Sequence, residues 1–468
     1  ERRALQVKRS ADNEVDALQA NDVGKLPDQN VAEAVRRLPG VSVANDQGEG
    51  RYVIIRGVNP NLANVTLNGQ TAPAPEPEGR QVKLDDIPSS IIGSVQISKT
   101  LTPDLDANAI AGQVDIATLS AFDRSHPFAY ARGAYGTYQL NGRNPYEGDV
   151  TIGGQMGPDD QFGVVIAANY SRRPIESENF GASAPTYRLV NGFDVPDLQT
   201  IRDYELVRTR TGLVANLDWR PNPNARLFLR GTYSKFTDHE TRDQFRIDNE
   251  SSFTNQTATT GAFKGRGCRY VRSRNEDDNT KNLAFGGAFD LPVGSLKLEG
   301  VWSRAEKIDP LRSEWLFRTS GSLLNVTYDT ADRFYLFTPD ANAYDSSKYS
   351  ANQVNYDHRQ AVETLWQGRA DYTVRLNALG RNSTLQAGFK IQSLDKTNNR
   401  DFQVYSASGF TLADTSPLTD ATSVYDGRYL FGPRVSYAGV EAYVAAHPGV
   451  LTQSASNKLS SLTNSLVN

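Results

Sequence analysis

Phe162-Gly163-Val164-Val165-Ile166-Ala167-Ala168-Asn169-Tyr170 alternates between two sets of side chains. The even positions carry Phe, Val, Ile, Ala and Tyr, and a period of two is that of a β-strand whose faces differ. The same split separates apolar from polar positions in 213–220, 295–303 and 385–392. Such segments recur at least eight times after about residue 128, with aromatic residues near their ends. One face of a long sheet is therefore predicted to meet lipid and the other water.

The connections between these segments fall into two length classes. Long connections of about 30 to 55 residues are predicted near 173–204, 237–281 and 306–361, and short turns at Gly157–Gln161, Pro221–Ala225, Pro292–Gly294 and Leu376–Ser383. Soluble β-sandwiches do not sort their connections in this way, whereas outer-membrane barrels have short periplasmic turns and long external loops. Counting on that scheme predicts nine strands, near residues 128, 149, 162, 205, 226, 282, 295, 362 and 384.

The odd number of strands has a consequence for closure. A bacterial single-chain barrel has an even number of strands, and an unpaired strand edge in lipid is costly. We therefore expect an incomplete barrel, with the chain ending in an external loop after about residue 396.

The composition excludes several classes of protein. The 50 basic and 54 acidic residues give a net charge of -4 and are mixed along the chain, without the basic stripe that nucleic-acid binding requires. No apolar run approaches the ~20 residues of a membrane-spanning helix. The first residues lack the apolar region of a signal peptide. A length of 468 residues implies at least two structural units.

Motifs that carry chemistry are few. The single cysteine, Cys268, cannot form an intrachain disulfide and is predicted to be a loop thiol. Asp104-x-Asp106-x-Asn108 opens like an EF-hand, but Ala109 and Asp115 stand where that loop needs Gly and Glu. Nucleophile-elbow and zinc-protease motifs are absent from the sequence. We predict no catalysis, no metal and no cofactor.

The first 120 residues have a different pattern. Residues 31–38 predict a helix that is capped by Asn30 and stopped by Pro39-Gly40. Its apolar face comprises Val31, Ala34, Val35 and Leu38. Short strand candidates follow at 41–43, 52–55, 65–67, 95–97 and 114–116, separated by turn residues. This pattern predicts a compact α/β domain.

Several ordered motifs run through residues 17–118. They are Gly24-Lys25-Leu26-Pro27-Asp28-Gln29-Asn30-Val31-Ala32-Glu33-Ala34, Leu38-Pro39-Gly40-Val41, Ile55-Arg56-Gly57, Leu67-Asn68-Gly69, Ile87-Pro88 and Asp104-Leu105-Asp106-Ala107-Asn108-Ala109-Ile110-Ala111-Gly112-Gln113-Val114-Asp115-Ile116. This segment resembles the plug domain of TonB-dependent outer-membrane receptors, most closely the group common in Caulobacter-like, Xanthomonas-like and sphingomonad bacteria. The resemblance implies an α/β plug domain at residues 1–120 inside a transmembrane antiparallel barrel of about 22 strands. Residues 121–468 would supply the first, incomplete part of that barrel.

The resemblance also implies a location and partners. The receptor would sit in the outer membrane of a Gram-negative bacterium, in contact with lipid, with its amino terminus in the periplasm. There the TonB-ExbB-ExbD energy-coupling complex would pull on a short TonB box. Residues 1–20 contain no convincing TonB box, so we expect it upstream or disordered. Architectural roles in the plug are expected for Arg56, Gly57, Asn68, Gly69 and Gly112, with Arg56 paired to a barrel carboxylate such as Asp218, Glu299 or Asp371.

Substrate is expected to meet three plug apices, Ala44–Arg51, Asn59–Asn64 and the proline-rich Thr71–Gln81. Their polar side chains can make directional hydrogen bonds, and the candidates are Asp46, Gln47, Glu49, Arg51, Asn59, Asn61, Asn64, Glu76, Glu78 and Arg80. The alternative is a set of solvated turn residues and, for the prolines, a rigid spacer. External-loop aromatics could stack on sugar rings, with Tyr335, Tyr344, Tyr425 and Tyr429 as candidates, or could simply pack the loops together.

The function expected from the resemblance is TonB-dependent import of a scarce nutrient. An oligosaccharide is the first expectation and a ferric siderophore the second. A surface-recognition receptor that works with a partner lipoprotein is the alternative class. An enzyme or a passive pore is disfavoured, because catalytic motifs are absent from the sequence and a plug would block a lumen.

Overall fold

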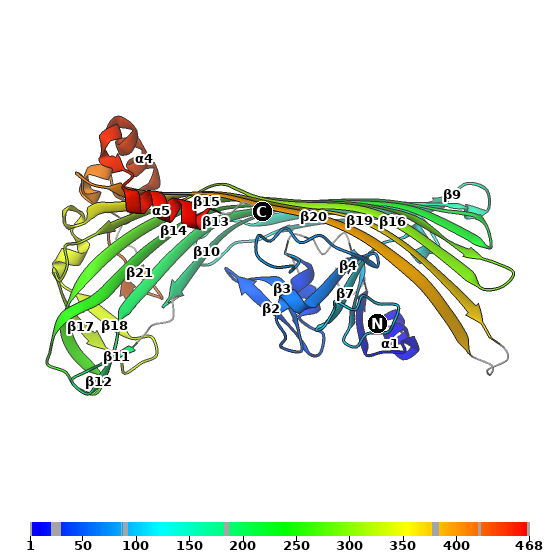
Figure 1. The fold of residues 1–468 in the computed structure, drawn as a ribbon, viewed down its shortest axis with the longest axis horizontal. Coiled ribbons are helices and arrows are strands. Elements are labelled where there is room, and N and C mark those ends of the chain that lie inside the picture. The colour runs from blue at the N-terminus through cyan, green and yellow to red at the C-terminus, as the bar shows by residue number, and fades with distance from the viewer. Residues whose placement is uncertain are drawn as a thin grey trace.

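The computed structural model describes residues 2–19, 30–85, 87, 92–181, 187–376, 383–419 and 423–465. Residues 24–29 and Pro88 of the quoted motifs, and residues 377–382 of one predicted turn, lie outside these ranges. Figure 1 shows a long, curved sheet whose concave face covers a smaller amino-terminal domain. Among the described residues, no helix has the length and the apolar character needed to cross a membrane.

The amino-terminal domain combines a five-stranded sheet with a separate hairpin and short helices. The sheet has the strand order β1-β6-β7-β4-β5, and β2 and β3 form the hairpin. The elements are α1 (Arg2–Ser10), β1 (Val15–Gln19), α3 (Val31–Val35), β2 (Val41–Asp46), β3 (Glu49–Ile55), η1 (Pro60–Leu62), β4 (Ala63–Leu67), β5 (Gln70–Thr71), β6 (Ile92–Ser98), β7 (Gly112–Thr118) and η3 (Ala121–Asp123). All five strand candidates of the sequence are confirmed, as β2, β3, β4, β6 and β7.

Helix α3 begins where the sequence predicts and ends early. The Asn30 side chain accepts a hydrogen bond from the Glu33 amide at 2.9 Å, so the predicted N-cap is confirmed. The helix stops at Val35, and Leu38 closes a tighter turn by donating its amide to the Val35 carbonyl. A proline disfavours the helical backbone conformation of the residue before it, which here is Leu38. The helix therefore ends before Pro39.

The larger sheet, called the wall sheet from here on, has twelve strands among the described residues, and nine of them are long. They are β8 (Phe128–Tyr135), β9 (Tyr146–Met156), β10 (Phe162–Phe180), β13 (Leu198–Asn222), β14 (Ala225–Thr254), β15 (Thr260–Asp290), β16 (Ser295–Arg318), β19 (Ser350–Arg375) and β20 (Thr384–Ala407), with η4 (Pro158–Asp160) in the β9–β10 turn. Neighbouring strands pair antiparallel. Each strand contains the position predicted for it, so the count of nine is confirmed.

The two faces of the wall sheet differ as the alternation predicts. On the convex face Phe389 is 69% exposed, and Phe162 stacks on Trp219 with ring centroids 5.8 Å apart. On the concave face the neighbour of Phe389, Lys390, donates to Asp106 of the amino-terminal domain at 2.8 Å. The sheet thus presents an apolar belt outward and polar side chains inward.

Two wall residues complete the core of the amino-terminal domain. Ala167 of β10 and Val214 of β13 belong to the same buried cluster as Val31, Ile55 and Val114. Burying a valine side chain contributes about 1.5–3 kcal/mol, so Val214 helps to hold the domain against the concave face.

The predicted long loops are wrong in most of their length, because strands occupy them. β14 and β15 have 30 and 31 residues, and only residues 255–259 separate them. Cys268, predicted in a loop, lies within β15 and is buried. At a rise of about 3.3 Å per residue such strands are roughly 100 Å long, far more than the apolar belt needs. The connection from β10 to β13 holds a hairpin of β11 (Tyr187–Val190) and β12 (Phe193–Pro196), and that from β16 to β19 holds β17 (Leu324–Asp329), β18 (Leu336–Pro339), η5 (Ala341–Tyr344) and η6 (Ser346–Lys348).

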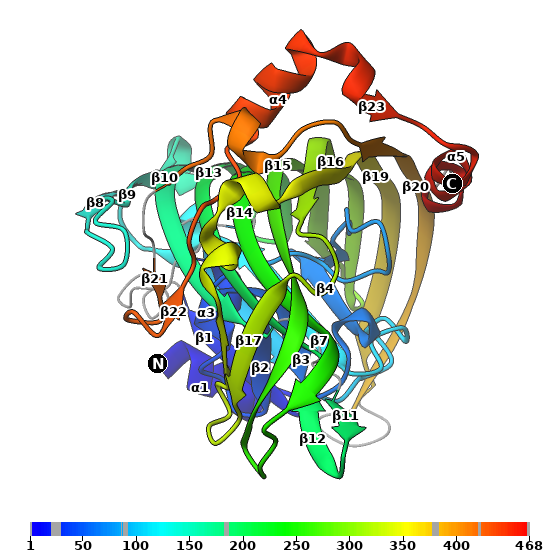
Figure 2. The ribbon, with the colours of Figure 1, turned by 90° about the vertical axis from the view of Figure 1, so that its left-hand side faces the viewer.

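The chain after β20 forms a small subdomain at the end of the wall sheet that carries the long connections (Figures 1 and 2). Its elements are η8 (Leu412–Thr415), β21 (Ser423–Val424), β22 (Tyr429–Leu430), α4 (Tyr437–Ala446), η9 (Pro448–Val450), β23 (Leu451–Thr452) and α5 (Ala455–Asn464). Val440 of α4 packs in one buried cluster with Trp315 and Phe317 of β16. Within the described residues the wall sheet is open, with β8 at one edge and β20 with β23 at the other.

Candidate functional site

The β2–β3 hairpin carries the first predicted apex, Ala44–Arg51. Figure 1 shows the hairpin directed away from α1 and toward the end of the wall sheet with the long connections. Its turn uses Gln47 and Gly48, both with positive φ (41° and 82°). Glycine accepts this conformation without strain, which explains why the chain reverses here.

Glu49 on this hairpin meets three wall arginines. Its carboxylate lies 2.8 Å from Arg208 and 2.7 Å from Arg210, and it also pairs with Arg173. Arg208, only 1% exposed, extends this contact to Asp46 at 3.1 Å and to the side-chain oxygen of Gln47 at 2.8 Å. Charge-assisted hydrogen bonds of this kind are the stronger ones, so the hairpin tip is firmly docked on β10 and β13.

A second cluster of charges surrounds Glu76. Arg51 contacts Glu76 at 3.1 Å and Asp46 at 3.0 Å. From the wall, Lys307 lies 3.4 Å from Glu76. Burial would raise the pKa of Glu76, but Lys307, Arg51 and Lys83 lower it to about 2, so this carboxylate is ionised at neutral pH.

The wall completes this cluster with Glu276. This buried carboxylate lies 2.8 Å from Lys83 and 3.3 Å from Lys307. Lys83 also pairs with Asp278 of β15. Burial tends to lower the pKa of Arg51, but the carboxylates of Glu276, Asp85 and Glu76 raise it well above the usual value.

The proline-rich apex Thr71–Gln81 is pinned to β19 and β20. The amide of Ala74 donates to Glu363 at 3.0 Å, and Gln367 bonds both the amide (3.1 Å) and the carbonyl (2.8 Å) of Thr71. Lys396 donates to the carbonyls of Ala74 and Gly79, each at 2.9 Å. The segment therefore lies along the wall as a contact strip, while Glu78 and Arg80 at its end are exposed.

The middle apex, Asn59–Asn64, is tied to the domain itself. Asn59 caps η1 by accepting from the Asn61 amide at 3.0 Å, and Asn61 accepts from the Arg80 amide at 2.9 Å. Asn64 is buried and donates to Asp106 at 3.2 Å and to Gln113. Asn59, Asn61 and Arg80 thus gather at one place, whereas Asn64 belongs to the core of the sheet.

The four candidate tyrosines lie in the loops of the long-connection end, and their rings are largely used there. Tyr335 and Tyr429 are each only 2% exposed, and Phe180 packs 5.1 Å from both rings. Tyr344 and Tyr425 are half-buried against the same cluster. This burial favours the alternative interpretation, in which these aromatics pack the loops together.

The partner predicted for Arg56 is wrong. Arg56 is exposed and donates to the Ala111 carbonyl at 3.2 Å. The three barrel carboxylates proposed for it have other partners: Asp218 accepts from Ser120, Glu299 from Gln70 and Asp371 from Arg369. The chain turns at Arg56 and Gly57, which both have positive φ (52° and 74°), directly after β3 ends.

Three further residues that were expected to be architectural have clear structural roles. Asn68 and Gly69 form the left-handed turn between β4 and β5, and the Gly69 amide donates to Asp115 at 2.7 Å. Gly112 has a φ of 136°, and a Cβ there would lie 2.7 Å from the Ser98 carbonyl oxygen. Glycine is therefore required at Gly112 by both backbone conformation and space.

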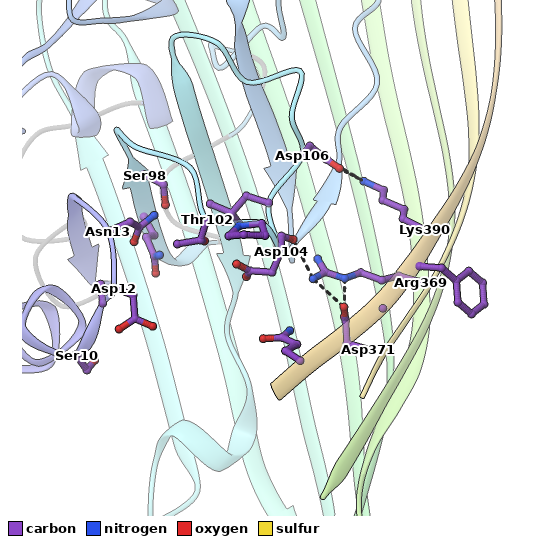
Figure 3. A pocket seen from close by; sticks show the side chains of 17 residues that line it. Ser10, Asp12, Asn13, Ser98, Thr102, Asp104, Asp106, Arg369, Asp371 and Lys390 are labelled. Carbon is purple, nitrogen blue, oxygen red and sulfur yellow. Dashed lines mark hydrogen bonds and ion pairs between the residues drawn. The ribbon is translucent and has the colours of Figure 1, made fainter. Parts of the chain in front are cut away.

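A cavity of about 770 Å³ lies on the opposite side of the amino-terminal domain, near α1 (Figure 3). Its lining joins Ser10, Asp12 and Asn13 to the wall residues Arg369 and Lys390. Burial would raise the pKa of Asp106 in this lining, but Lys390, Thr71 and Asn64 lower it. The EF-hand-like carboxylate is thus an ion-pair partner of the wall.

The wall residues of these clusters were missed by sequence reasoning. Arg208, Arg210, Glu276 and Lys307 occupy concave-face positions of their strands. Each of them stands in its strand at an alternate position that faces the polar side of the sheet. A charged residue at such a position is the sequence signal that would have identified them.

Comparison with known proteins gives a family for the amino-terminal part of the chain. Residues 7–113 match the family described as the TonB-dependent receptor plug domain. Residues 7–113 therefore form a domain of the TonB-dependent receptor plug family. Receptors of this family are proteins of the Gram-negative outer membrane. No curated protein sequence matches the chain, and the narrower bacterial group stays a prediction.

Solved structures that are similar to this chain share little of its sequence. The siderophore receptor PirA from Acinetobacter baumannii is 12% identical, with a TM-score of 0.38 over 86% of this chain and 79% of that one. A mutant of the ferric enterobactin receptor from Pseudomonas aeruginosa is 11% identical, with a TM-score of 0.39 over 90% and 75%. The outer membrane transporter YddB from Escherichia coli is 10% identical, with a TM-score of 0.35 over 86% and 75%.

Proposed function

We propose that this protein imports a scarce polar nutrient across the outer membrane by TonB-dependent active transport. The observation that carries the proposal is the docking of the plug domain on the concave face of the wall sheet. Its hairpin and its proline-rich strip reach the wall through buried charges, as at Glu49 and Arg208. A plug held in this way blocks the inside of the sheet until an external force moves it.

The orientation follows from the same arrangement. We propose that the short-turn end of the wall sheet, near α1, faces the periplasm, where the TonB-ExbB-ExbD complex would reach the amino terminus. The long-connection end would then face outward, and the apolar belt would contact outer-membrane lipid. The proposed domain boundary at residue 120 falls between β7 and β8, beside η3.

Apart from the buried Asn64, the candidate substrate residues on the plug divide into two groups. Asp46, Gln47, Glu49, Arg51 and Glu76 hold the plug on the wall, so we propose that they respond to substrate through movement of the hairpin. Asn59, Asn61, Glu78 and Arg80 keep more of their polar groups free for a ligand. Oligosaccharides and ferric siderophores are both polar enough for such a surface, so a test includes both.

Uptake of labelled ligands by cells that express the receptor tests this proposal. We expect accumulation of one ligand class in cells with an energised TonB complex and its loss in cells without TonB. Equal uptake in both strains would contradict active transport. Binding is better followed by calorimetry than by tryptophan fluorescence, because Trp219 and Trp366 are exposed on the convex face and Trp315 is buried under α4. Co-purification from the same cells tests for a surface lipoprotein partner.

A further inference from the structure

Six neighbouring strands of the wall sheet each place one arginine on the concave face, beyond the hairpin tip of the plug. We call this set the arginine ladder; it comprises Arg202, Arg242, Arg272, Arg312, Arg359 and Arg400, from β13, β14, β15, β16, β19 and β20. The alternation of side chains puts Arg202 on the same face as Arg208, which contacts the plug. The other five arginines lie on this face as well, because the strand pairing aligns them with one another. A bulge between Asp309 and Arg312 keeps both of these residues on the concave face.

The ladder brings like charges directly opposite one another. Arg242 faces Arg272 across β14 and β15, and Arg359 faces Arg400 across β19 and β20. Arg312 faces a further arginine, Arg274. Like charges in directly opposed positions destabilise a sheet, so folding alone does not favour this pattern.

Four arginines of the ladder form ion pairs with three carboxylates. Arg359 and Arg400 share Asp357, at 2.6 Å and 2.8 Å. Arg242 pairs with Glu314, and Arg272 with Glu240. Arg312, in the middle of the ladder, is not among these pairs.

Arg312 is the member without a partner. Among the residues that the structure describes, it forms neither a hydrogen bond nor an ion pair within 4 Å. Burial and the charges of Arg272 and Arg359 lower its pKa to about 10, although Asp309 acts in the other direction. The middle of the ladder therefore carries an excess of positive charge.

The ladder lies above the plug and outside the lipid. Glu240, the partner of Arg272, accepts from Gln47 at the hairpin tip at 3.4 Å. On the convex face at the same level, Trp315 is covered by α4 and not exposed like the belt residues. A ligand that enters from the long-connection end would meet the ladder before it meets the plug.

We propose that the arginine ladder binds a ligand that carries several carboxylate groups in an extended arrangement. Guanidinium groups bind carboxylates in a bidentate way, and lysines would not give the same geometry. Strands are about 4.8 Å apart, so six of them form a cationic band of roughly 24 Å. The proposal rests on the import function above and names its substrate class; an oligomer of sugar acids and a carboxylate-rich ferric chelate are the two sources of that chemistry.

Calorimetric titration of the purified receptor tests the ladder. The probes are an oligogalacturonate, a neutral galacto-oligosaccharide of the same length and ferric citrate. We expect at least one acidic probe to bind, and its affinity to fall about tenfold in R312Q and in R359Q and with rising salt. R304Q is the matched control, because Arg304 lies on the same strand but on the convex face, in the register of Trp302. It removes the same charge and should leave the affinity unchanged.

The outcomes separate the alternatives. Binding of the sugar acid alone assigns the ladder to acidic oligosaccharides, and binding of ferric citrate alone assigns it to a chelate. Binding of the neutral oligosaccharide only, binding of no probe, or acidic binding that R312Q and R359Q leave unchanged overturns the proposal. TonB-dependent uptake of a neutral sugar would leave the import function standing while the ladder proposal fails. Circular dichroism of each variant checks that the sheet is intact.

Discussion

The carboxylate of Glu49 on the plug hairpin lies 2.8 Å from the guanidinium of Arg208 on β13. Both side chains are buried, and Arg173 and Arg210 share the same carboxylate. Removing one member of a buried ion pair leaves the other charge uncompensated, which costs more than the pair itself contributes. The attachment of the plug to the wall therefore depends strongly on this one residue.

Replacing Glu49 by Gln tests that dependence. We expect a loss of about 3–5 kcal/mol in the stability of the docked plug, because three arginines lose the carboxylate that they share. Hydrogen exchange of the β2–β3 hairpin measures it. The control is Asp332→Asn, which breaks an exposed pair with Arg428 and should leave stability almost unchanged. Equal protection of the hairpin in both variants would contradict the docking role.

The ion pairs of Glu76 should resist acid. In the folded protein the pKa of Glu76 is about 2, below its usual value of 4.5. The ionised carboxylate therefore contributes its full stabilisation at pH values above about 4.5. This contribution is lost as the pH falls through about 2. We expect the difference in melting temperature between the wild type and Glu76→Gln to be constant above pH 5 and to shrink steadily below it. A difference that disappears already at pH 5 would show that Lys307 and Arg51 do not hold this carboxylate.

The apolar belt makes a prediction about lipid. Phe389 and Asp395 lie on the same face of β20, the second six residues nearer the long-connection end, and both are exposed. Phe389→Arg should cost about 2–4 kcal/mol in the free energy of folding into a bilayer, because it places a charge in hydrocarbon. Asp395→Arg is the matched control and should cost about 1 kcal/mol or less. Equal costs would mean that the lipid boundary has been drawn in the wrong place.

Cys268 can report unfolding of the wall. It is 2% exposed, and burial raises the pKa of its thiol, which lies beyond the belt, to about 12. Since the thiolate is the reactive form, we expect no labelling by a maleimide in the folded receptor at pH 7 and rapid labelling in denaturant. Labelling of the folded protein at the rate of a free thiol would contradict the pairing of β15 at this residue.

The sequence predicted the belt well and the outer part of the wall poorly, for one physical reason. Where one face is apolar, as at Leu385, Phe389 and Ile391, apolar and polar residues alternate and the period of two is visible. Beyond the belt both faces of a strand meet water or charge. In β14 the outward Thr237 and His239 alternate with the inward Asp238 and Glu240, so the pattern vanishes although the strand continues.

The candidate site was predicted in part for a related reason. The apex segments could be found because turn residues and prolines mark them in the plug. Their partners could not, because Glu276 and Lys307 are more than a hundred residues away and their pairing depends on how the strands align. Polar residues expected to meet substrate, such as Glu49, were therefore found to be engaged by the wall.

In the proposed orientation, the length of β14 and β15 also determines which surface the protein presents to molecules outside the cell. The backbone is paired nearly up to residues 255–259, and proteases cut most readily at exposed, unpaired loop tips. Enzymes secreted by competitors would find little to cleave along this stretch of the wall. Antibodies and phage tail fibres would meet the side of the paired strands and only a very small loop at their tip. Sequence variation that prevents their binding would therefore be concentrated in the side chains of the paired strands.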